Sequence, residues 1–255
     1  MRWIYLSPHF DDVVLSCGGL VCEQVRAGQS VQVWTICAGQ PPAGAPLSGF
    51  AQQLHDRWQT GPEAALIRRL EDEAAGRVLG ATTVYWDLPD CIYRRLPDGP
   101  FLVNGEDDLW QPLHPQEAGV AAALSAWLKA GLLPDDQLVV PMTLGSHVDH
   151  HLVRAAAEAT SRRLAYYADY PYAIRHPQAL HALLRPSWQA VCASISSAGL
   201  AGWQMAVAQH TSQINTFWKG PDEMRAVLAQ YWQAGGGACL WFESLCKKEG
   251  SFQLF

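Results

Sequence analysis

Residues 3–12 read WIYLSPHFDD, and this stretch decides the fold class. Its apolar part, residues 3–6, is short and rich in aromatic and β-branched side chains, which is typical of a buried strand. His9, Asp11 and Asp12 follow at once, before a helix-prone segment. The stretch therefore predicts a strand that carries an imidazole and two carboxylates at its carboxyl end, the side of an open α/β sheet where ligands bind.

A second stretch, residues 138–150, repeats this arrangement. The apolar residues 138–141 are followed by His147, Asp149 and His150. If both strands belong to one parallel sheet, the two clusters meet at the same edge. Together they supply two histidines and a carboxylate for a metal ion, with carboxylates to spare. This is the ligand set of a hydrolytic zinc centre, which keeps one coordination position open for water.

The first motif also has a simpler interpretation. An aspartate between a strand and a helix can cap the free N–H groups of the helix and meet the positive end of its dipole. That interpretation explains Asp11 and Asp12, but it does not explain a second cluster at the matching position of another strand. We therefore favour the metal site.

Strand and helix patterns alternate along the chain, which predicts an α/β fold. We expect strands at 3–7, 31–37, 82–86, 137–141 and 164–168, and helices at about 12–27, 62–79, 116–130, 149–163, 199–217 and 221–233. Two segments rich in Gly and Pro, 38–61 and 87–115, are too long for simple connections, and we expect them to form the rim of the site and to select the substrate. No repeat or linker interrupts the pattern, so we expect one domain over residues 1–255.

Composition argues against several classes of protein. The net charge is −6, only 16% of the residues are charged, and no cluster of Lys and Arg occurs, which disfavours nucleic acid as a partner. No apolar stretch approaches the ~20 residues of a membrane span. The seven cysteines show no C-x-x-C spacing. We therefore expect buried, reduced thiols in a cytoplasmic protein without a signal peptide. The sequence leaves open whether the chain forms a homo-oligomer.

The motifs also carry a specific resemblance. PHFDD at 8–12, followed by LSCGG at 15–19, is similar to the H-P-D-D-E-x-x-x-G-C-G-G signature of the PIG-L/LmbE-like N-deacetylases, and HVDH at 147–150 is similar to their H-P-D-H motif. Further similarities lie in Arg68-x-Leu70-Glu71 with Leu79-Gly80, in Leu88-Pro89-Asp90 and in Thr211-Ser212-Gln213. Members of this family are zinc-dependent and remove N-acyl groups, usually acetyl groups from N-acetylglucosamine units.

The resemblance implies a Rossmann-like, mostly parallel sheet with helices on both faces and the metal site at the carboxyl ends of the strands. It also implies that His9, Asp12 and His150 bind one Zn²⁺ per chain, or another divalent metal. Each of these side chains offers an atom that zinc accepts as a ligand.

The resemblance assigns catalytic roles to three further residues. Asp11 would be the general base for the attacking water, since a carboxylate that does not bind the metal can remove a proton. His147 would protonate the leaving amine as an imidazolium or stabilise the oxyanion, and as an acid it would set the alkaline limb of a bell-shaped pH profile. Asp149 would orient a histidine.

Arg68 and Asp90 are the substrate-binding residues that the resemblance suggests. Both also have simpler interpretations. Arg68 lies three residues before Glu71 in a predicted helix, which is the spacing of an ion pair on a solvated face. Asp90 follows a proline and is a typical turn residue.

The chain departs from the family pattern at three positions, where Phe10, Val13 and Val148 replace two prolines and an acidic residue. We expect these replacements to make the mouth of the site more apolar. Three of the eleven tryptophans lie in or beside loops and are candidates for a platform on which a sugar stacks, namely Trp58, Trp110 and Trp218.

The predicted function is metal-dependent hydrolysis that removes an N-acyl group, in the first place acetyl, from a small N-acetylglucosamine-type amino sugar or its conjugate. The alternative is hydrolysis of another amide or of a phosphoester on the same scaffold. A nucleotide-dependent oxidoreductase is disfavoured, because the first turn between strand and helix lacks G-x-G-x-x-G. It also places two carboxylates where a pyrophosphate would sit, and their charges would repel it.

Overall fold

One seven-stranded sheet forms the centre of the molecule. The computed structural model describes residues 1–41, 44–97, 99–243 and 254. The strand order is β3-β2-β1-β4-β5-β7-β6. The strands are β1 (Arg2–Ser7), β2 (Ser30–Thr35), β3 (Thr82–Tyr85), β4 (Gln137–Pro141), β5 (Leu164–Tyr167), β6 (Trp188–Cys192) and β7 (Cys239–Glu243). Strands β1 to β5 pair in parallel, whereas β7 is antiparallel to both β5 and β6. The predicted α/β class with a mostly parallel sheet is confirmed.

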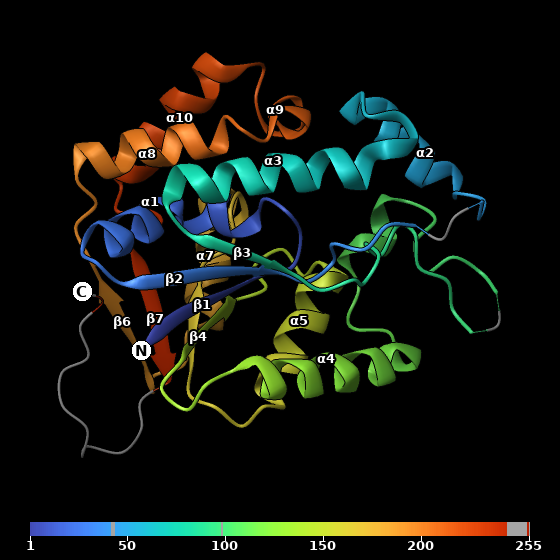
Figure 1. Ribbon diagram of the computed structural model, residues 1–255, viewed down its shortest axis with the longest axis horizontal. Helices are drawn as coiled ribbons and strands as arrows, with labels where there is room; N and C mark the ends of the chain where they lie inside the picture. Colours follow the sequence, from blue (N-terminus) through green and yellow to red (C-terminus); the bar gives the residue numbers. More distant parts are fainter. Residues whose placement is uncertain (42–43, 98, 244–253, 255) are drawn as a thin grey trace.

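Helices cover both faces of this sheet (Figure 1). Trp3 and Tyr5 of β1 belong to the core cluster that includes side chains of α1, α3, α8 and α10, whereas Ile4 and Leu6 belong to the cluster with α4 and α5. Successive side chains of β1 therefore pack alternately into two apolar layers, one on each face of the sheet, as expected for a strand that is buried on both faces. The helices are α1 (Asp12–Arg26), α2 (Gly49–Trp58), α3 (Ala64–Leu79), α4 (Ala118–Gly131), α5 (Val148–Glu158), α6 (Tyr172–Arg175), α7 (Pro177–Leu183), α8 (Ser197–Val207), α9 (Thr211–Phe217) and α10 (Pro221–Gln233), with 3₁₀ segments at Gly61–Glu63, Glu106–Trp110 and Pro115–Glu117.

The chain changes direction across the sheet between β1 and β4. The sequence builds outward from β1 to β2 and β3 on one side, and from β4 to β5 on the other. In sheets of this type, ligands bind beyond the carboxyl ends of the strands at this switch point. His9 follows β1, and α5, which comes after β4, carries His150 near its start. Both sequence clusters therefore meet at the switch point.

Several predicted elements differ from the structure. Residues 38–61 contain helix α2, which begins where the Ser48 side chain accepts a hydrogen bond from the Ala51 N–H and ends at Gln59, whose backbone is left-handed. The predicted helix at 199–217 is two helices, α8 and α9, and the helix predicted to reach 163 ends at Glu158. Four short elements, α6, α7, β6 and β7, were not predicted, and the two strands form the antiparallel part of the sheet.

The expectation of reduced thiols throughout is wrong for two of the cysteines. Cys192 and Cys239 form a disulfide between directly opposed positions of β6 and β7, with a Cα–Cα distance of 4.0 Å. Antiparallel pairing brings together cysteines that are 47 positions apart, which no spacing in the sequence could reveal. Four other cysteines are free and buried, namely Cys17, Cys22, Cys37 and Cys91. Cys246 lies outside the described residues.

Gly18 and Gly19 allow α1 to pack closely against α8. A Cβ atom on Gly18 would lie 2.6 Å from the Trp203 ring, and one on Gly19 would lie 2.8 Å from it. The indole N–H of Trp203 donates a hydrogen bond to the Val14 carbonyl at 2.6 Å. In the part of the chain that the structure describes, no helix is long and apolar enough to cross a membrane.

Candidate active site

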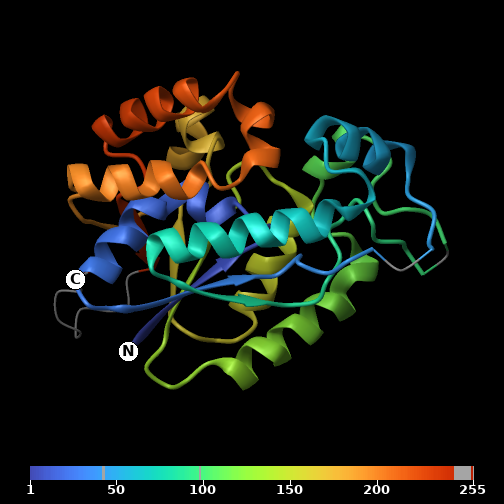
Figure 2. The same cartoon turned by 45° about the horizontal axis from the view of Figure 1, so that its top comes forward.

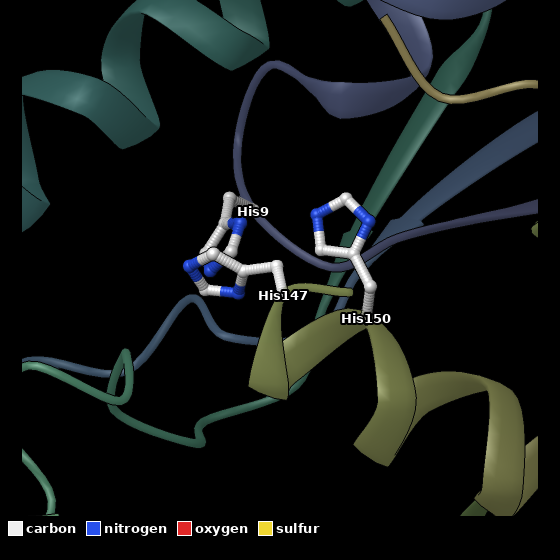
Figure 3. A group of neighbouring side chains, drawn as sticks. All are labelled: His9, His147 and His150. Atoms are coloured by element: carbon white, nitrogen blue, oxygen red, sulfur yellow. The ribbon is translucent and has the colours of Figure 1, made fainter. Parts of the chain in front are cut away.

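Three histidines face one another at the switch point (Figure 3). His9 comes from the turn after β1, and His147 and His150 come from the start of α5. The ring centroid of His9 lies 4.8 Å from that of His147 and 5.6 Å from that of His150. The sequence clusters that were predicted to converge are therefore in contact.

Asp12 lies between two of these rings. Its Oδ2 is 3.2 Å from His9 Nδ1, and its Oδ1 is 3.3 Å from His150 Nε2. The second nitrogen of each ring is held by another buried carboxylate. His9 Nε2 is 3.0 Å from Asp149 Oδ2, and His150 Nδ1 is 2.7 Å from Asp169 Oδ1. His9 and His150 thus each have one ring nitrogen that contacts a buried carboxylate and a second ring nitrogen that faces Asp12.

This arrangement fits a divalent cation. The carboxylates raise the pKa of His9 above its usual value and that of His150 to about 9, although burial alone would lower both. A site that stabilises two imidazolium charges can stabilise a cation in place of their protons. A carboxylate behind each ring is also the arrangement that orients histidine ligands in metal sites. His9, Asp12 and His150 could therefore hold the metal.

His147 offers a second donor set. One ligand atom each from His9, His147 and His150 can be chosen so that all three lie within 4.8 Å of one another. However, His147 Nδ1 accepts a hydrogen bond from the Asp149 backbone N–H at 3.2 Å, as the cap of α5. Only Nε2 of this ring is left for a ligand or a substrate.

Asp149 is fully buried and is held by several partners. Its Oδ1 accepts a hydrogen bond from the Arg94 guanidinium at 2.7 Å, and its Oδ2 accepts one from the Cys91 backbone N–H at 3.0 Å. Burial raises the pKa of Asp149, but Arg94 and His9 outweigh it and hold the pKa well below its usual value. The charged carboxylate therefore faces His9. Arg94 is itself paired with Glu117 at 2.6 Å.

Arg68 faces the catalytic cluster rather than Glu71. Its guanidinium lies 3.3 Å from Asp11 Oδ1 and 3.9 Å from Asp90 Oδ2. It also stacks over the Trp58 ring at 4.7 Å. Arg68 is only 7% exposed, so the interpretation as a pair on a solvated helix face is wrong. Asp11 occupies the cap position of α1, but its side chain makes no capping hydrogen bond, which also rules out the simple capping role.

Asp90 combines the two roles that its position suggested. Its Oδ1 accepts a hydrogen bond from the Ile92 N–H at 3.2 Å, as a turn aspartate does. Its Oδ2 lies 3.7 Å from His9 Nε2 and near Arg68. The turn therefore directs this carboxylate into the site.

A cavity of about 310 Å³, which we call the active-site cavity, is lined by seven of these residues, namely His9, Asp11, Asp12, Arg68, Asp90, His147 and His150. Both predicted rim segments contribute to its wall, through α2 and through Ile92, Leu109 and Trp110. Of the three tryptophans considered for a sugar platform, Trp58 and Trp110 line the cavity, whereas Trp218 is buried against Tyr170. Further wall residues come from elements that the sequence reading did not assign to the site: Tyr170, Pro171, Tyr172, Arg175, Gln213, Thr216 and Phe217.

The comparisons with known proteins agree with this geometry. The family model described as PIG-L, GlcNAc-PI de-N-acetylase, matches residues 4–161. This chain belongs to the PIG-L family. The 2'-N-acetylparomamine deacetylase of Niallia circulans is 27% identical over 192 residues, which are 70% of each chain. The enzyme of the same name from Streptomyces fradiae is 29% identical over 185 residues, which are 68% of this chain but only 58% of that protein.

Solved structures of PIG-L-type deacetylases share the fold over nearly the whole chain. The zinc-inhibited form of the teicoplanin deacetylase Orf2 superposes with a TM-score of 0.79 and 26% identity, covering 95% of this chain and 97% of that one. An N,N'-diacetylchitobiose deacetylase from Pyrococcus horikoshii, at 17% identity and a TM-score of 0.56, shares the fold. The predicted family is therefore confirmed.

The PIG-L motif departures do not alter the mouth of the site as expected. Phe10, Val13 and Val148 are each at most 3% exposed, and none of them lines the active-site cavity. Phe10 instead lies under the guanidinium of Arg68, 5.7 Å from ring centroid to Cζ. The three replacements therefore lie in the core beneath the site and not at its mouth.

Proposed function

We propose that this PIG-L chain is a zinc-dependent N-deacetylase that removes acetyl groups from N-acetylglucosamine-type amino sugars or their conjugates. The observation that carries the proposal is the pair of imidazoles that face Asp12 while Asp149 and Asp169 hold their other nitrogens. Relatives named as deacetylases of an acetylated aminoglycoside support the amide as the bond that is cleaved.

His9, Asp12 and His150 would hold the ion. When bound, a divalent cation would polarise the substrate carbonyl and make a water molecule more acidic. We favour Asp12 over His147 as the third ligand, because Asp12 contacts both rings directly. His147 is restrained by its capping hydrogen bond.

Asp11 is the base in this proposal. Its carboxylate lines the cavity beside Asp12, and Arg68 restrains one of its oxygens at 3.3 Å. The free oxygen can accept a proton from the attacking water and later pass it to the departing nitrogen. Arg68 thus orients Asp11, and together with Asp90 it offers polar atoms to the hydroxyl groups of a sugar.

His147 acts as a neutral donor in our proposal. Because Nδ1 accepts the Asp149 N–H, the ring proton lies on Nε2. Burial and the charges of His9 and His150 lower the pKa of His147, which also favours the neutral ring. The Nε2–H group can donate to the negative charge that develops on the amide oxygen. This replaces the imidazolium role that the sequence suggested. Asp149 contacts His9 and therefore orients a metal ligand rather than His147 through its side chain.

An amine-release assay tests the proposal. Purified protein is loaded with one equivalent of Zn²⁺ and incubated with N-acetylglucosamine and a panel of its glycosides, and the free amine is quantified. A chelated sample and an aryl phosphate ester serve as controls. We expect zinc-dependent amine release and no phosphate release. Phosphate release without amine release would instead support a phosphoesterase, and activity that survives complete removal of metal would contradict the metal-dependent mechanism.

A further inference from the structure

Glu71 connects helix α3, which carries Arg68, to the start of α9. Its Oε1 accepts hydrogen bonds from the Thr211 hydroxyl at 2.6 Å and from the Ser212 backbone N–H at 2.8 Å. Its Oε2 accepts a hydrogen bond from the Ser212 hydroxyl at 2.6 Å. Glu71 is 8% exposed and lies one helical turn from Arg68, which contacts Asp11. The start of α9 is therefore fixed relative to the proposed base.

The same hydrogen bonds determine how the side chain of Gln213 is oriented. The hydroxyl of Ser212 must donate its only proton to Glu71, because an ionised carboxylate can only accept. The Ser212 oxygen is then an acceptor for its other neighbour, which lies 3.0 Å away on Gln213. That neighbour must be the amide nitrogen Nε2. The chemistry thus settles the orientation of an amide whose two ends are otherwise hard to distinguish.

Gln213 lines the active-site cavity and is 5% exposed. Its Nε2 donates one N–H group to Ser212. Among the residues that the structure describes, the second N–H group and the carbonyl oxygen Oε1 have no hydrogen-bond partner, so both are available to a ligand. A hydroxyl group matches this pair, because it can accept from the N–H and donate to the carbonyl oxygen. A buried amide with unused polar atoms gains most from a partner that supplies both contacts.

We propose that Gln213 contacts a ring hydroxyl of the substrate and thereby selects a hydroxylated amino sugar, and that Glu71 is the positioning residue that aims it through Ser212. The proposal rests on the proposed deacetylase function and deepens it. It assigns a substrate contact to α9, which lies outside the segment that the family model matches, residues 4–161.

Deoxy analogues test the contact. We would measure kcat/KM for amine release from an aryl N-acetylglucosaminide and from its 3-deoxy, 4-deoxy and 6-deoxy analogues, with the wild type and with Gln213→Met. Met keeps the length of the side chain but cannot form either hydrogen bond. We expect Gln213→Met to lower kcat/KM for the parent substrate about 3- to 10-fold, the usual effect of a neutral hydrogen bond. It should have no effect on the one analogue that lacks the contacted hydroxyl.

A matched control and two outcomes make this experiment decisive. Gln233→Met places the same substitution at an exposed position of α10, outside the cavity, and should leave all four values unchanged. If Gln213→Met lowers kcat/KM by the same factor for the parent and every analogue, the hydroxyl contact is refuted while the deacetylase function stands. If the wild type releases no amine from any of the four compounds, the proposed function fails, and the contact fails with it.

Exchanging the carboxylate and the amide tests the positioning role. Gln213→Glu alone would leave two carboxylates competing for the single Ser212 proton, so its melting temperature should fall. Adding Glu71→Gln reverses the direction of these hydrogen bonds. The amide N–H at 71 can donate to the Ser212 hydroxyl, which then donates to the carboxylate at 213. The double variant should therefore recover most of the melting temperature, and because a carboxylate at 213 can still accept a hydrogen bond from the substrate hydroxyl, it should also recover selectivity against the deoxy analogue. Additive losses of melting temperature in the two single variants and the double variant would refute the link through Ser212.

Discussion

Two of the cavities are each lined in part by residues of the segment 168–177, and they differ in chemistry more than in size. The active-site cavity measures about 310 Å³, and a second one, which we call the apolar cavity, measures about 460 Å³. Tyr167, Tyr231 and Trp241 line the apolar cavity, and no Asp, Glu, His, Lys or Arg is among its lining residues. The larger space thus has no carboxylate, imidazole, ammonium or guanidinium group in its wall. What marks the functional site is buried charge held in place by named partners, rather than volume.

The metal ligands should provide the largest contrast between the two cavities. We expect His9→Ala and His150→Ala to lose bound zinc and to lower amine release by roughly 10³-fold or more, because hydrolysis depends on the activated water. Zinc content by atomic spectroscopy and activity are measured on the same samples. Tyr231→Phe in the apolar cavity is the control and should keep its zinc. Full zinc content in both histidine variants would refute the ligand assignment. Loss of zinc in His147→Gln but not in Asp12→Asn would show that His147, and not Asp12, is the third ligand.

Asp11 should separate catalysis from metal binding. Asp11→Asn keeps the size of the side chain but cannot accept a proton, so we expect a fall in kcat of about 10²- to 10⁴-fold. Zinc content should stay at one ion per chain. A loss of zinc equal to that of Asp12→Asn would mean that the two aspartates have exchanged roles.

His147 should have a smaller effect and a distinctive pH dependence. We expect His147→Gln to retain zinc and to lower kcat about 10²- to 10³-fold, the range for removing a donor to a developing oxyanion. The lowered pKa of His147 means that the ring gains its second proton only under acidic conditions, so the neutral donor is present at neutral and alkaline pH. The alkaline limb of the pH profile should therefore be the same in the variant and the wild type. If the alkaline limb disappears in His147→Gln, the proton donor is the imidazolium form of His147.

The apolar cavity should give the smallest effect. Val227→Leu adds one methylene group to a side chain that lines it. We expect zinc content to be unchanged and kcat/KM to change less than about 3-fold, because no charged group or substrate contact is altered. A change of tenfold or more would show that residues 168–177 transmit packing changes to the site.

The sequence predicted the parallel half of the fold far better than the rest. The runs at 3–7 and 137–141 match β1 and β4 closely, because buried parallel strands are continuous apolar runs. Strand β6 has mostly exposed or half-exposed residues, and its pairing with β7 depends on contacts with residues far away in the sequence. Strand β6 therefore carries no local signal strong enough to identify it. Strand β7 does carry one, since its sequence CLWFE is largely apolar and every second residue is buried.

The candidate site shows the same division. The two motifs predicted that His9, Asp12 and His150 would lie together, and the structure places them together. Asp149 was also expected to orient a histidine and contacts His9. Two other supporting groups were missed. Asp169 holds His150 from the end of β5, and Arg94 holds Asp149 from an irregular segment. A polar residue at the carboxyl end of a predicted strand was the available signal for Asp169, whereas nothing around Arg94 in the sequence indicates its burial.

The disulfide between Cys192 and Cys239 closes a covalent ring that contains the whole of α8, α9 and α10. In the chain-entropy description, closing a ring of this length lowers the conformational entropy of the unfolded chain. The free energy of unfolding rises by about 4 kcal/mol as a result. Neither cysteine lines the active-site cavity. Reduction would remove this stabilisation, so the fraction of molecules that are folded would depend on the redox state of the surroundings.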